Sequence, residues 1–329
     1  MNKFLPKKLG THNGQFHCDE AFGSYMLKLL YPNLEIIRTR DEKLLAECDI
    51  VIDVGAVYDH SKRRYDHHQK SFTHSMSTLI PNAKWTTKLS SAGLIYVHYG
   101  HDVLAKIINT HIPENHLNSI YSKIYESFVQ EVDAIDNGVS MYEGKPKYTI
   151  NTNLSNRVGN LNKKWNHIGK FDEMAAFEKA MEMIGSEFTE NVLYAYNSWF
   201  PARSIVLESL ENRFKIHSSG QILELKQFCP WKEHYFLLEE EFGDDLNPKI
   251  NFVVFGDSNG SWRVQAMPIS PDSFELRKPL PESWQGLRDD ELSNISGISN
   301  CIFCHATGFI GGNLTRNGAI EMAEKAIKL

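Results

Sequence analysis

Histidine and carboxylate side chains crowd into two short stretches of this chain. Residues 10–22 read GTHNGQFHCDEAF and residues 64–69 read RYDHHQ, while DIVIDV and EVDAIDNG supply further aspartates. Carboxylate oxygens suit Mg²⁺ and Mn²⁺, and imidazole moves the preference toward Mn²⁺. Several carboxylates on one rim would repel each other unless cations lay between them. These residues therefore favour a divalent-cation site. The candidate ligands are His12, His17, Asp19, Asp53, one of the pair His67 and His68, Asp133 and Asp136.

Each of these pieces also has a plain structural explanation. Asp53 could cap a helix that follows it. Adjacent His67 and His68 point to opposite faces of an extended strand, so at most one is expected to be a direct ligand. Asp133 and Asp136, three residues apart, could form a solvated helix face. It is the occurrence of all the pieces together, in order along the chain, that favours the metal site.

Alternating strands and helices are expected to bring these residues together. KKLGTH, LEIIRTR (34–40) and DIVIDV (49–54) have strand patterns, and EAFGSYMLKLL (20–30) and DEKLLAEC have helical ones. Such alternation is typical of βαβ units, and ligands of open α/β sheets bind beyond the carboxyl ends of the strands. His12, Asp53 and the Asp-His-His triplet each follow a strand. If the strands are parallel neighbours, these side chains meet at one edge of the sheet.

The rest of the chain divides near residue 200. Longer helices are predicted over residues 90–109, 116–136 and 171–200, the last interrupted near Gly185. After Pro201, RFKIHSSGQILELK and INFVVFGDSNGSWRVQAMP each read as two strands around a turn, and Thr315 is a plausible N-cap of a final helix. We expect an α/β domain over residues 1–200, a parallel sheet with helices on both faces. A smaller β-rich α+β domain is expected over residues 201–329.

Composition narrows the function classes. With 42% hydrophobic and 23% charged residues, the 329-residue chain is typical of a folded soluble protein, and its net charge of −6 argues against a broad basic surface for duplex nucleic acid. Five cysteines, an odd number without framework spacing, favour a reducing compartment. MNKFLPKKLG resembles neither a signal peptide nor a transit peptide, and no apolar run is long enough to cross a bilayer. We expect a cytoplasmic or nuclear protein that binds no membrane, with a mitochondrial location and a homo-oligomeric state left open.

The order of these motifs resembles that of the DHH phosphoesterase superfamily. One branch is closer still: the chain resembles the melanocyte-proliferating-gene family of 3′→5′ RNA exonucleases, which act on RNA in the nucleus and mitochondrion. THNGQFHCDEA, VIDVGAVYD, RYDHHQ, TKLSSAGLIY, EVDAIDNG, NTNLSNRVGNLN and HATGFIGGN carry this resemblance. The motifs run from about residue 10 to residue 313, which is nearly the whole chain. The resemblance implies a DHH-like metal-binding phosphoesterase domain followed by a substrate-binding domain.

The resemblance also implies roles for single residues. It assigns one of two divalent cations, Mn²⁺ or Mg²⁺, to His12, His17 and Asp53. The second is assigned to Asp19, Asp53, His67 and Asp133, with Asp53 bridging. Asp136 is a rival to Asp133, because its Asp-Asn-Gly resembles the Asp-Thr-Gly of other superfamily members. Many members carry Asp one residue closer to the first histidine than His17 stands here. The catalytic set is then Asp53, His67, His68 and Asp133.

Candidate substrate contacts are spread over both domains. HATGFIGGN precedes the last helix, where its backbone N–H groups could form an anion nest. His68 could hydrogen-bond a phosphoryl oxygen or protonate the leaving oxygen, and Lys88 and Ser91 are expected near the metal rim. Trp85, Trp165, Trp231 and Trp262 are available for base stacking. The candidate substrate-binding residues are His68, Arg157, Arg263, His305, Gly311, Gly312 and Arg316.

Three functions from different classes fit these observations. The first is two-metal hydrolysis of single-stranded RNA or short oligonucleotides from the 3′ end, in RNA processing. The second is hydrolysis of a small phosphate compound such as a dinucleotide, a nucleotide or pyrophosphate, with which the acidic net charge is compatible. The third is a regulatory protein that keeps the fold without catalysis. The intact ligand set argues against the third.

Overall fold

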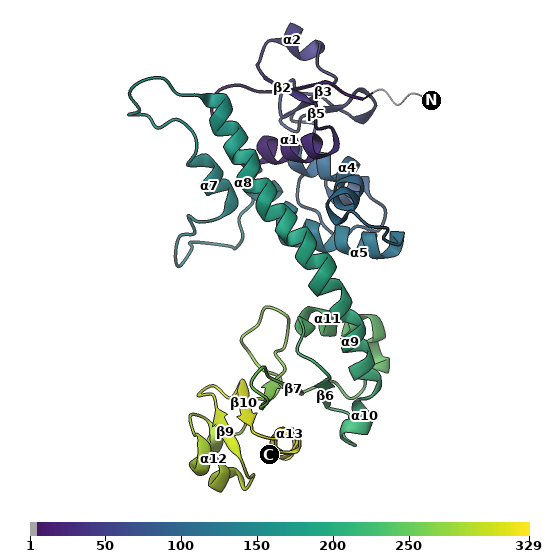
Figure 1. Cartoon of the computed structure of the whole chain (residues 1–329), viewed down its shortest axis with the longest axis vertical. Helices are drawn as coiled ribbons and strands as arrows, with labels where there is room; N and C mark the ends of the chain where they lie inside the picture. The colour runs from purple at the N-terminus through teal and green to yellow at the C-terminus, as the bar shows by residue number, and fades with distance from the viewer. Residues whose placement is uncertain (1–4) are drawn as a thin grey trace. The chain divides into compact units, whose positions relative to one another are not determined.

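The computed structural model describes residues 5–329, and the chain forms two compact units, Met1–Tyr196 and Asn197–Leu329 (Figure 1). The sequence expectation placed a domain boundary at residue 200. Each unit contains its own mixed sheet of five strands. The fold is thus mixed α/β.

The first unit alternates strands and helices from Lys8 to Ile52, as the sequence predicts. Its strands are β1 (Lys8–Thr11), β2 (Glu35–Arg38), β3 (Ile50–Ile52), β4 (Tyr58–Asp59) and β5 (Arg64–Tyr65). Its helices are α1 (Cys18–Leu30), α2 (Glu42–Ala46), α3 (Met76–Leu79), α4 (Ser91–Ile108), α5 (Glu114–Ile124), α6 (Gln130–Asp136), α7 (Leu154–Gly159) and α8 (Glu173–Tyr194). A 3-10 turn covers His60–Lys62, and a π-helix covers Tyr125–Val129 between α5 and α6.

The order of the strands creates a switch point between β1 and β3. The sheet runs β2-β1-β3-β5-β4, with parallel pairing from β2 to β5 and an antiparallel edge strand, β4. The chain passes from β1 to β2, which pairs with one side of β1. It then returns to β3, which pairs with the other side of β1. Such reversals open a crevice at the carboxyl ends of the two central strands, which is where ligands of open α/β sheets bind.

Helices cover both faces of this sheet, and β3 shows why. Val51 packs with Leu45 and Cys48 on the face that α2 covers. Ile52 points the other way, so that a Cβ on Gly23 of α1 would lie 3.2 Å from it. A strand that is apolar on both faces is the pattern expected for a central parallel strand. In Figure 1, α1 lies below the sheet and α2 above it.

One predicted helix break is wrong. Helix α8 runs through Gly185 without interruption, and a π-helix at Ala195–Trp199 follows it. A Cβ at Gly185 would lie 2.1 Å from the ring of Tyr25 on α1. The glycine therefore allows two helices to approach closely, rather than ending one of them. The helix predicted over 116–136 also differs, because the π-helix divides it.

The second unit has helices on both faces of its sheet. Its strands are β6 (Ile222–Leu225), β7 (Phe252–Gly256), β8 (Trp262–Ala266), β9 (Cys301–Cys304) and β10 (Ile310–Asn313), in the order β6-β7-β8-β10-β9. Its helices are α9 (Phe200–Glu211), α10 (Arg213–Ile216), α11 (Trp231–Phe242), α12 (Asp289–Ser296) and α13 (Arg316–Lys328), with 3-10 turns at Gly243–Asp245 and Glu282–Trp284. Alternate residues of β7 point to opposite faces, Val254 into a core with α12 and α13, Val253 into one with α9 and α11.

Local predictions in the second unit are partly confirmed. The hairpin of β7 and β8 forms as predicted, and the Thr315 side chain accepts a hydrogen bond from Gly318 at the start of α13. RFKI, predicted as a strand, is instead the helical turn α10. Its strand-like apolar alternation is too short to distinguish a strand from one helical turn.

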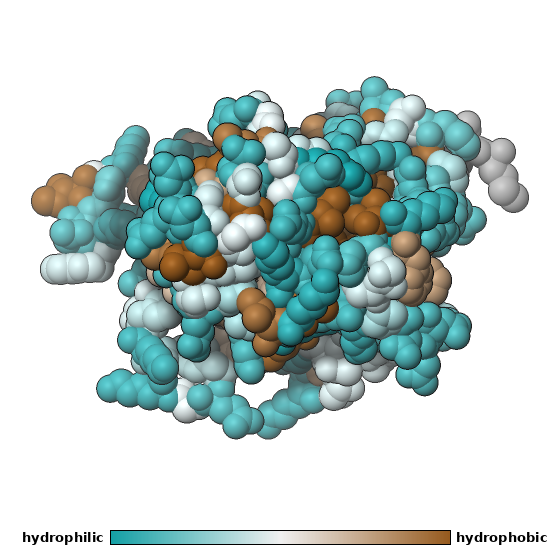
Figure 2. Space-filling view, turned by 90° about the horizontal axis from the view of Figure 1, so that it is seen from below, coloured by the Kyte–Doolittle hydropathy of each residue, from teal (hydrophilic) through white to brown (hydrophobic). Residues whose placement is uncertain are grey.

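Hydrophobic side chains also lie on the surface of the molecule. Figure 2 shows brown side chains in separate groups among hydrophilic ones on the face it presents. No helix within residues 5–329 combines the length and apolar content needed to cross a bilayer.

Candidate metal centre

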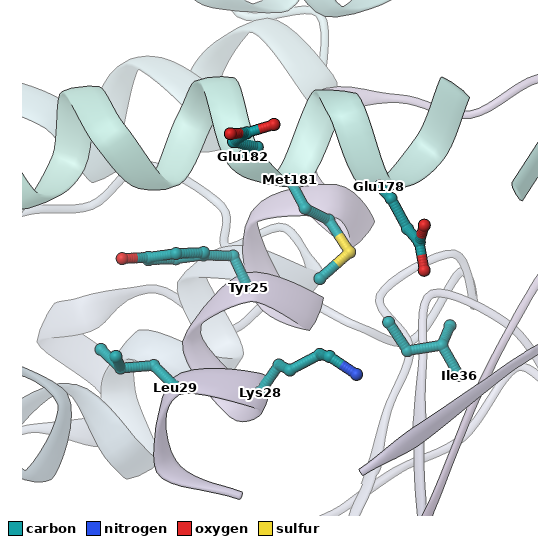
Figure 3. A pocket seen from close by; sticks show the side chains of 7 residues that line it. All are labelled: Tyr25, Lys28, Leu29, Ile36, Glu178, Met181 and Glu182. Atoms are coloured by element: carbon teal, nitrogen blue, oxygen red, sulfur yellow. The ribbon is translucent and has the colours of Figure 1, made fainter. Parts of the chain in front are cut away.

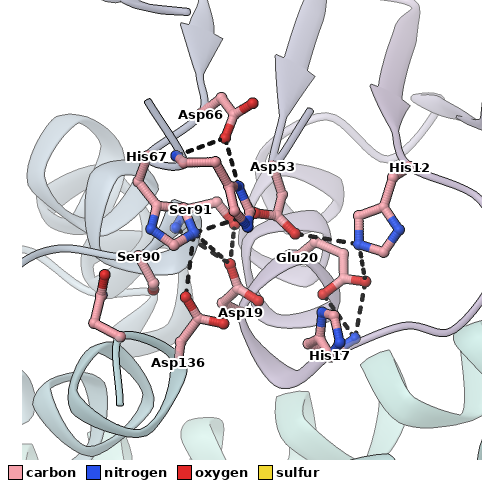
Figure 4. A network of polar contacts seen from close by, with 12 residues as sticks. His12, His17, Asp19, Glu20, Asp53, Asp66, His67, Ser90, Ser91 and Asp136 are labelled. Carbon is pink, nitrogen blue, oxygen red and sulfur yellow. Dashed lines mark hydrogen bonds and ion pairs between the residues drawn. The ribbon is translucent and has the colours of Figure 1, made fainter. Parts of the chain in front are cut away.

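Three neighbouring strands end at the same cluster of side chains. His12 directly follows β1, Asp53 directly follows β3, and His67 comes two residues after β5. All three side chains are buried, and Asp19 joins them from the first turn of α1 (Figure 4). The cluster therefore occupies the switch point of the sheet, as the sequence predicts for strands that are parallel neighbours.

The backbone at Asp53 takes an uncommon conformation. Its φ is +58°, in the left-handed region, and its N–H donates to the carbonyl of Tyr65 on β5 at 3.0 Å. Aspartate and asparagine tolerate this region better than most residues, and non-glycine residues held there often lie at functional sites. The turn is continued by Gly55, whose φ is also positive. It directs the Asp53 carboxylate between two histidines.

Asp53 joins the two halves of the cluster. Its Oδ2 lies 3.2 Å from His12 Nε2, and its Oδ1 lies 3.3 Å from His67 Nε2. On the first side, Glu20 Oε1 lies 3.0 Å from His12 Nε2. On the second, Asp136 Oδ2 lies 3.1 Å and Asp19 Oδ2 3.8 Å from His67 Nε2.

His17 stands at the more open side of the cluster. It is the N-cap of α1, and its backbone N–H donates to the Glu20 carboxylate at 2.9 and 3.0 Å. Its ring centroid lies 5.7 Å from that of His12, and its side chain is exposed. A glutamate at the third helical position that accepts from the N-cap N–H is half of a capping box, which explains why α1 starts here.

Several buried polar side-chain atoms in the cluster have no hydrogen-bond partner. They are Asp19 Oδ1, Asp53 Oδ1 and both ring nitrogens of His67. The 3.3 Å between Asp53 and His67 is an ion-pair distance without hydrogen-bond geometry. Buried polar atoms are nearly always satisfied, so such atoms converging on one point suggest a missing partner.

A divalent cation fits these atoms. Donor atoms within 4.8 Å of one another form three overlapping groups that share Asp53 or His67: His12, His17, Glu20 and Asp53; Asp53, His67 and His68; Asp19, His67 and Asp136. Every donor is an imidazole nitrogen or a carboxylate oxygen. This set matches Mn²⁺ or Mg²⁺ and lacks the thiolates typical of a closed structural zinc site.

Without cations the cluster retains protons. Burial opposes the charged form of His12, but Asp53 and Glu20 outweigh it and raise its pKa to about 10. Burial also raises the pKa of Asp136 to about 8, and the nearby Asp19 charge adds to the increase. Burial and the Asp53 charge likewise raise the pKa of Asp19. A bound cation would favour the deprotonated carboxylates, so metal binding should release protons.

The structure separates the two aspartates of EVDAIDNG. Asp136 belongs to the cluster, whereas Asp133 is fully buried one helical turn earlier and belongs to none of the three groups. Asp133 Oδ1 accepts from the N–H and the hydroxyl of Ser90 at 2.9 and 2.7 Å, and its Oδ2 accepts from the Tyr125 hydroxyl at 3.0 Å. Both oxygens are therefore occupied, and the assignment of Asp133 as a ligand does not fit this arrangement.

Asp133 instead holds α6 against the start of α4. Ser90 is the N-cap of α4, and the next residue, Ser91, donates its hydroxyl to Asp19 Oδ2 at 2.7 Å. A Cβ at Gly93 would lie 2.3 Å from Asp133 Oδ1, so only glycine leaves room for this carboxylate. Asp133 thereby supports the helix that carries Asp136.

His68 lies on the rim of the cluster. Its side chain is 63% exposed, and its Nδ1 lies 2.8 Å from Asp66 Oδ1 and 3.5 Å from Asp53 Oδ1. The hydrogen bond to Asp66 raises the pKa of His68. Asp66 is buried and also accepts from the backbone of Ala56. Asp66 thus holds the His68 ring through its Nδ1 atom.

Comparison with known proteins gives the family. A family model described as "Uncharacterised protein family (UPF0160)", MYG1_exonuc, matches residues 8–327. The chain belongs to the MYG1 exonuclease family. It is similar to the protein named MYG1 exonuclease in Rattus norvegicus, with 51% identity over 99% of this chain and 86% of that one. The Homo sapiens protein of the same name is 50% identical over 98% of this chain and 86% of its own length.

A solved structure adds little to this assignment. A pGpG-specific phosphodiesterase from Vibrio cholerae matches over 97% of each chain with 14% identity and a TM-score of 0.29. A score that low carries no argument about fold or function.

The arginines predicted to contact phosphate already have partners in this MYG1-family chain. Arg157 pairs with Glu187, Arg263 with Asp257, and Arg316 with Glu224. A phosphate would have to displace a carboxylate from each. Phosphate contact at these arginines stays a prediction, and the sequence does not reveal the acidic residue that lies opposite each of them.

The anion nest predicted at the last helix is not formed as expected. Gly311 and Gly312 lie in β10, paired antiparallel with β8 on one side and β9 on the other. A strand paired on both sides uses its backbone N–H groups in the ladder. A Cβ at Gly312 would lie 2.9 Å from the ring of Phe303, which accounts for the glycine by close packing. His305 is exposed at the turn before β10 and contacts Thr307 at 3.0 Å.

The remaining sequence candidates lie in different surroundings. Ser91 contacts Asp19, as described, and the backbone of Lys88 accepts from Asn137, next to Asp136, so both lie near the centre. Trp231 is buried, Trp85 and Trp262 are partly buried, and Trp165 is 97% exposed. Only the last can stack on a ligand without rearrangement.

A cavity of about 380 Å³ lies between α1, β2 and α8, away from the cluster (Figure 3). Tyr25, Leu29, Ile36 and Met181 give it an apolar lining, and Lys28, Glu178 and Glu182 also line it. It contains none of the cluster residues.

The sequence placed Glu20 and Asp66 among the clustered residues but gave neither a role, and it did not indicate Ser90 as part of the site. The spacing of His17 and Glu20, N-cap and third helical position, is a recognisable capping signal. Glu20 also contacts His12, and this second contact depends on the fold and has no local sequence signature.

Proposed function

We propose that this chain is a divalent-cation-dependent phosphodiesterase that shortens single-stranded RNA from its 3′ end. The observation that carries the proposal is the convergence of buried, unpartnered carboxylate oxygens and imidazole nitrogens at the carboxyl ends of β1, β3 and β5. Family membership supports the nuclease part, since the mammalian relatives are named exonucleases. The RNA substrate and the direction follow the family resemblance of the sequence motifs.

Two cations fit the cluster best. His12, His17, Glu20 and Asp53 would hold one, and Asp19, Asp53, His67 and Asp136 would hold the other, with Asp53 shared. This assignment differs from the sequence expectation in two respects: Asp136 takes the place of Asp133, and Glu20 is added. The mixture of imidazole and carboxylate favours Mn²⁺ over Mg²⁺.

The residues of the rim then have distinct tasks. Cations bound in the cluster would supply an activated water and offset charge on the phosphoryl oxygens. His68 keeps one ring nitrogen on Asp66, so its other nitrogen can donate to a phosphoryl oxygen or to the leaving oxygen. Its raised pKa keeps the imidazole protonated closer to neutral pH, as a general acid requires.

The test is hydrolysis of a 5′-labelled single-stranded RNA with Mn²⁺, with Mg²⁺ and with chelator. The matched variant is Asp53→Asn, because asparagine also tolerates the positive φ at this position and the backbone turn is kept. We expect a ladder that shortens from the 3′ end, needs the cation and is abolished in Asp53→Asn.

Other outcomes assign other functions. Metal-dependent hydrolysis of dinucleotides or pyrophosphate without action on RNA would identify a small-molecule phosphohydrolase. Cleavage that persists in chelator would contradict the metal-dependent mechanism. Bound Mn²⁺ with no hydrolysis of any of these compounds would favour a regulatory protein.

A further inference from the structure

One segment differs in charge from the rest of the chain. Residues 137–171 contain six basic residues and one acidic residue, a net charge of +5 in a chain whose net charge is −6. Of the six, Arg157 pairs with Glu187. None of the five lysines forms an ion pair among the described residues, and all five are exposed. They are Lys145, Lys147, Lys163, Lys164 and Lys170.

The same segment exposes aromatic rings. Trp165 exposes 97% of its surface and Tyr148 75%, and Tyr142 is also exposed. These residues lie in the two loops on either side of α7, which Figure 1 draws as long traces between α6 and α8. Large aromatic rings exposed to water carry a free-energy penalty, and burial against a ligand would remove that penalty. Rings interleaved with lysines are typical of surfaces that bind single-stranded nucleic acid.

The segment is fixed to the metal centre at two points. It starts one residue after Asp136, whose carboxylate lies 3.1 Å from His67 Nε2. Farther along, the buried Asn162 accepts from the backbone N–H of Phe16 at 2.9 Å and donates to its carbonyl at 2.7 Å. Phe16 immediately precedes His17. Both loops are therefore tied to backbone that carries cluster residues.

We propose that residues 137–171 bind the single-stranded nucleic acid that extends beyond the phosphate held at the metal centre. Tyr148 and Trp165 would stack on bases, and the unpaired lysines would neutralise phosphates. The charge complements a polyanion, and the chain continues directly from Asp136 into this surface. The inference rests on the proposed function for its position in the reaction, but its binding part can be tested alone.

Substrate length follows from this surface. A chain of several nucleotides can occupy both the metal centre and the loops, whereas a dinucleotide occupies little beyond the metal centre. The segment therefore favours oligonucleotides over dinucleotides as substrates. Its loss should weaken binding of long RNA and leave dinucleotide hydrolysis unchanged.

The experiment measures binding of a fluorescein-labelled 20-nucleotide oligouridylate by anisotropy. Ca²⁺ replaces Mn²⁺, and a gel confirms that the RNA stays intact. Tyr148→Ala/Trp165→Ala should raise the Kd at least about 30-fold, the factor expected when two stacked bases are lost at the low end of their usual contribution. The matched control is Phe228→Ala/Phe274→Ala, two exposed aromatic residues outside the segment, which should leave the Kd unchanged.

A second variant tests the charges. Lys145→Gln/Lys147→Gln should reduce the slope of log K against log salt by roughly 1.4, because about 0.7 counterions are released per phosphate of a single strand. Hydrolysis of the dinucleotide UpU with Mn²⁺ should keep its wild-type rate in both segment variants.

The outcomes separate the two proposals. If wild type hydrolyses RNA but Tyr148→Ala/Trp165→Ala binds it as tightly as wild type does, the inference is overturned and the proposed function stands. If wild type binds RNA through the segment but hydrolyses none, the proposed function fails and the binding surface stands. Equal weakening in the control, a matching loss of UpU hydrolysis, or no RNA binding by wild type would each overturn the inference.

Discussion

The strongest prediction concerns the same substitution made at two positions one helical turn apart. Asp136→Asn removes a carboxylate that lies 3.1 Å from His67 Nε2, in a group that can hold a cation. Asp133→Asn changes a carboxylate whose two oxygens accept hydrogen bonds from Ser90 and Tyr125. We expect Asp136→Asn to lose cation binding and Asp133→Asn to retain it.

The magnitudes follow from these contacts. Changes to residues around metal ligands commonly weaken affinity 10–100-fold, so loss of a ligand should reach about 100-fold. At a cation concentration 100 times the wild-type Kd, binding stabilises wild type by about 2.7 kcal/mol. A 100-fold weaker site would leave about 0.4 kcal/mol. In Asp133→Asn the amide oxygen can still accept from Ser90 and the amide nitrogen can donate to Tyr125, so the cost to stability should stay near about 1 kcal/mol.

The measurement is thermal unfolding of wild type and both variants, with chelator and over a Mn²⁺ titration, together with Mn²⁺ binding by calorimetry. In chelator, Asp136→Asn should unfold at or above the wild-type temperature. Burial raises the Asp136 pKa to about 8, so near neutral pH the carboxyl must bind a proton on folding, and this cost disappears with asparagine. The Mn²⁺-dependent increase should be nearly absent in Asp136→Asn and intact in Asp133→Asn.

The opposite pattern would refute the reasoning. If Asp133→Asn abolished the Mn²⁺-dependent stabilisation while Asp136→Asn kept it, Asp133 would be the ligand and its contacts with Ser90 and Tyr125 would have to change when a cation binds. A loss in both variants would show that α6 is positioned cooperatively, and that the structure does not separate ligand from support.

Three further predictions use other parts of the site. His68→Ala should leave Mn²⁺ affinity unchanged within about threefold and reduce kcat at least about 100-fold, the contribution typical of a general acid; calorimetry showing lost Mn²⁺ binding would exclude this role. Without metal, thermal stability should fall as the pH rises from 6.5 toward 9. The pKa values of His12 (about 10) and Asp136 (about 8) are raised, so in this pH range the folded state binds more protons than the unfolded state. Thermal stability in chelator that did not change with pH would contradict this. Gly93→Ala should lower the free energy of unfolding by about 3 kcal/mol or more. Its Cβ would lie 2.3 Å from Asp133 and disturb a buried acceptor of three hydrogen bonds. The control Gly159→Ala, with open space around the glycine, should be nearly neutral in the same unfolding assay.

The sheet edge could be predicted from sequence because its signals are local. DIVIDV is apolar on both faces, as a central parallel strand must be, and alternating helices leave few topologies open. Once β1, β3 and β5 are parallel neighbours, their carboxyl ends lie at the same edge of the sheet. The residues that follow those ends, His12, Asp53 and His67, are then expected to lie close together. Residue order alone therefore predicts that these three meet.

Helix α6 shows where local signals are insufficient. Asp133 and Asp136 are both aspartates and lie in the same helix. No sequence pattern shows which of them faces the strands. The choice depends on the angle at which α6 packs against α4, and the π-helix at Tyr125–Val129 changes that angle by adding a residue to one turn. Gly93 and Ser90, which accept Asp133 into the interface, lie forty or more positions away in sequence.

The arginines differ for the same reason. Arg157, Arg263 and Arg316 are equivalent to any exposed arginine in sequence, and only the folded chain shows that each faces a carboxylate. The lysines of residues 137–171 form no such ion pair among the described residues. Basic charge that the fold has already neutralised cannot attract a polyanion, whereas basic charge left unpaired beside exposed rings can. The phosphate backbone of the substrate is therefore expected along the loops around α7, and not at the arginines that composition alone would select.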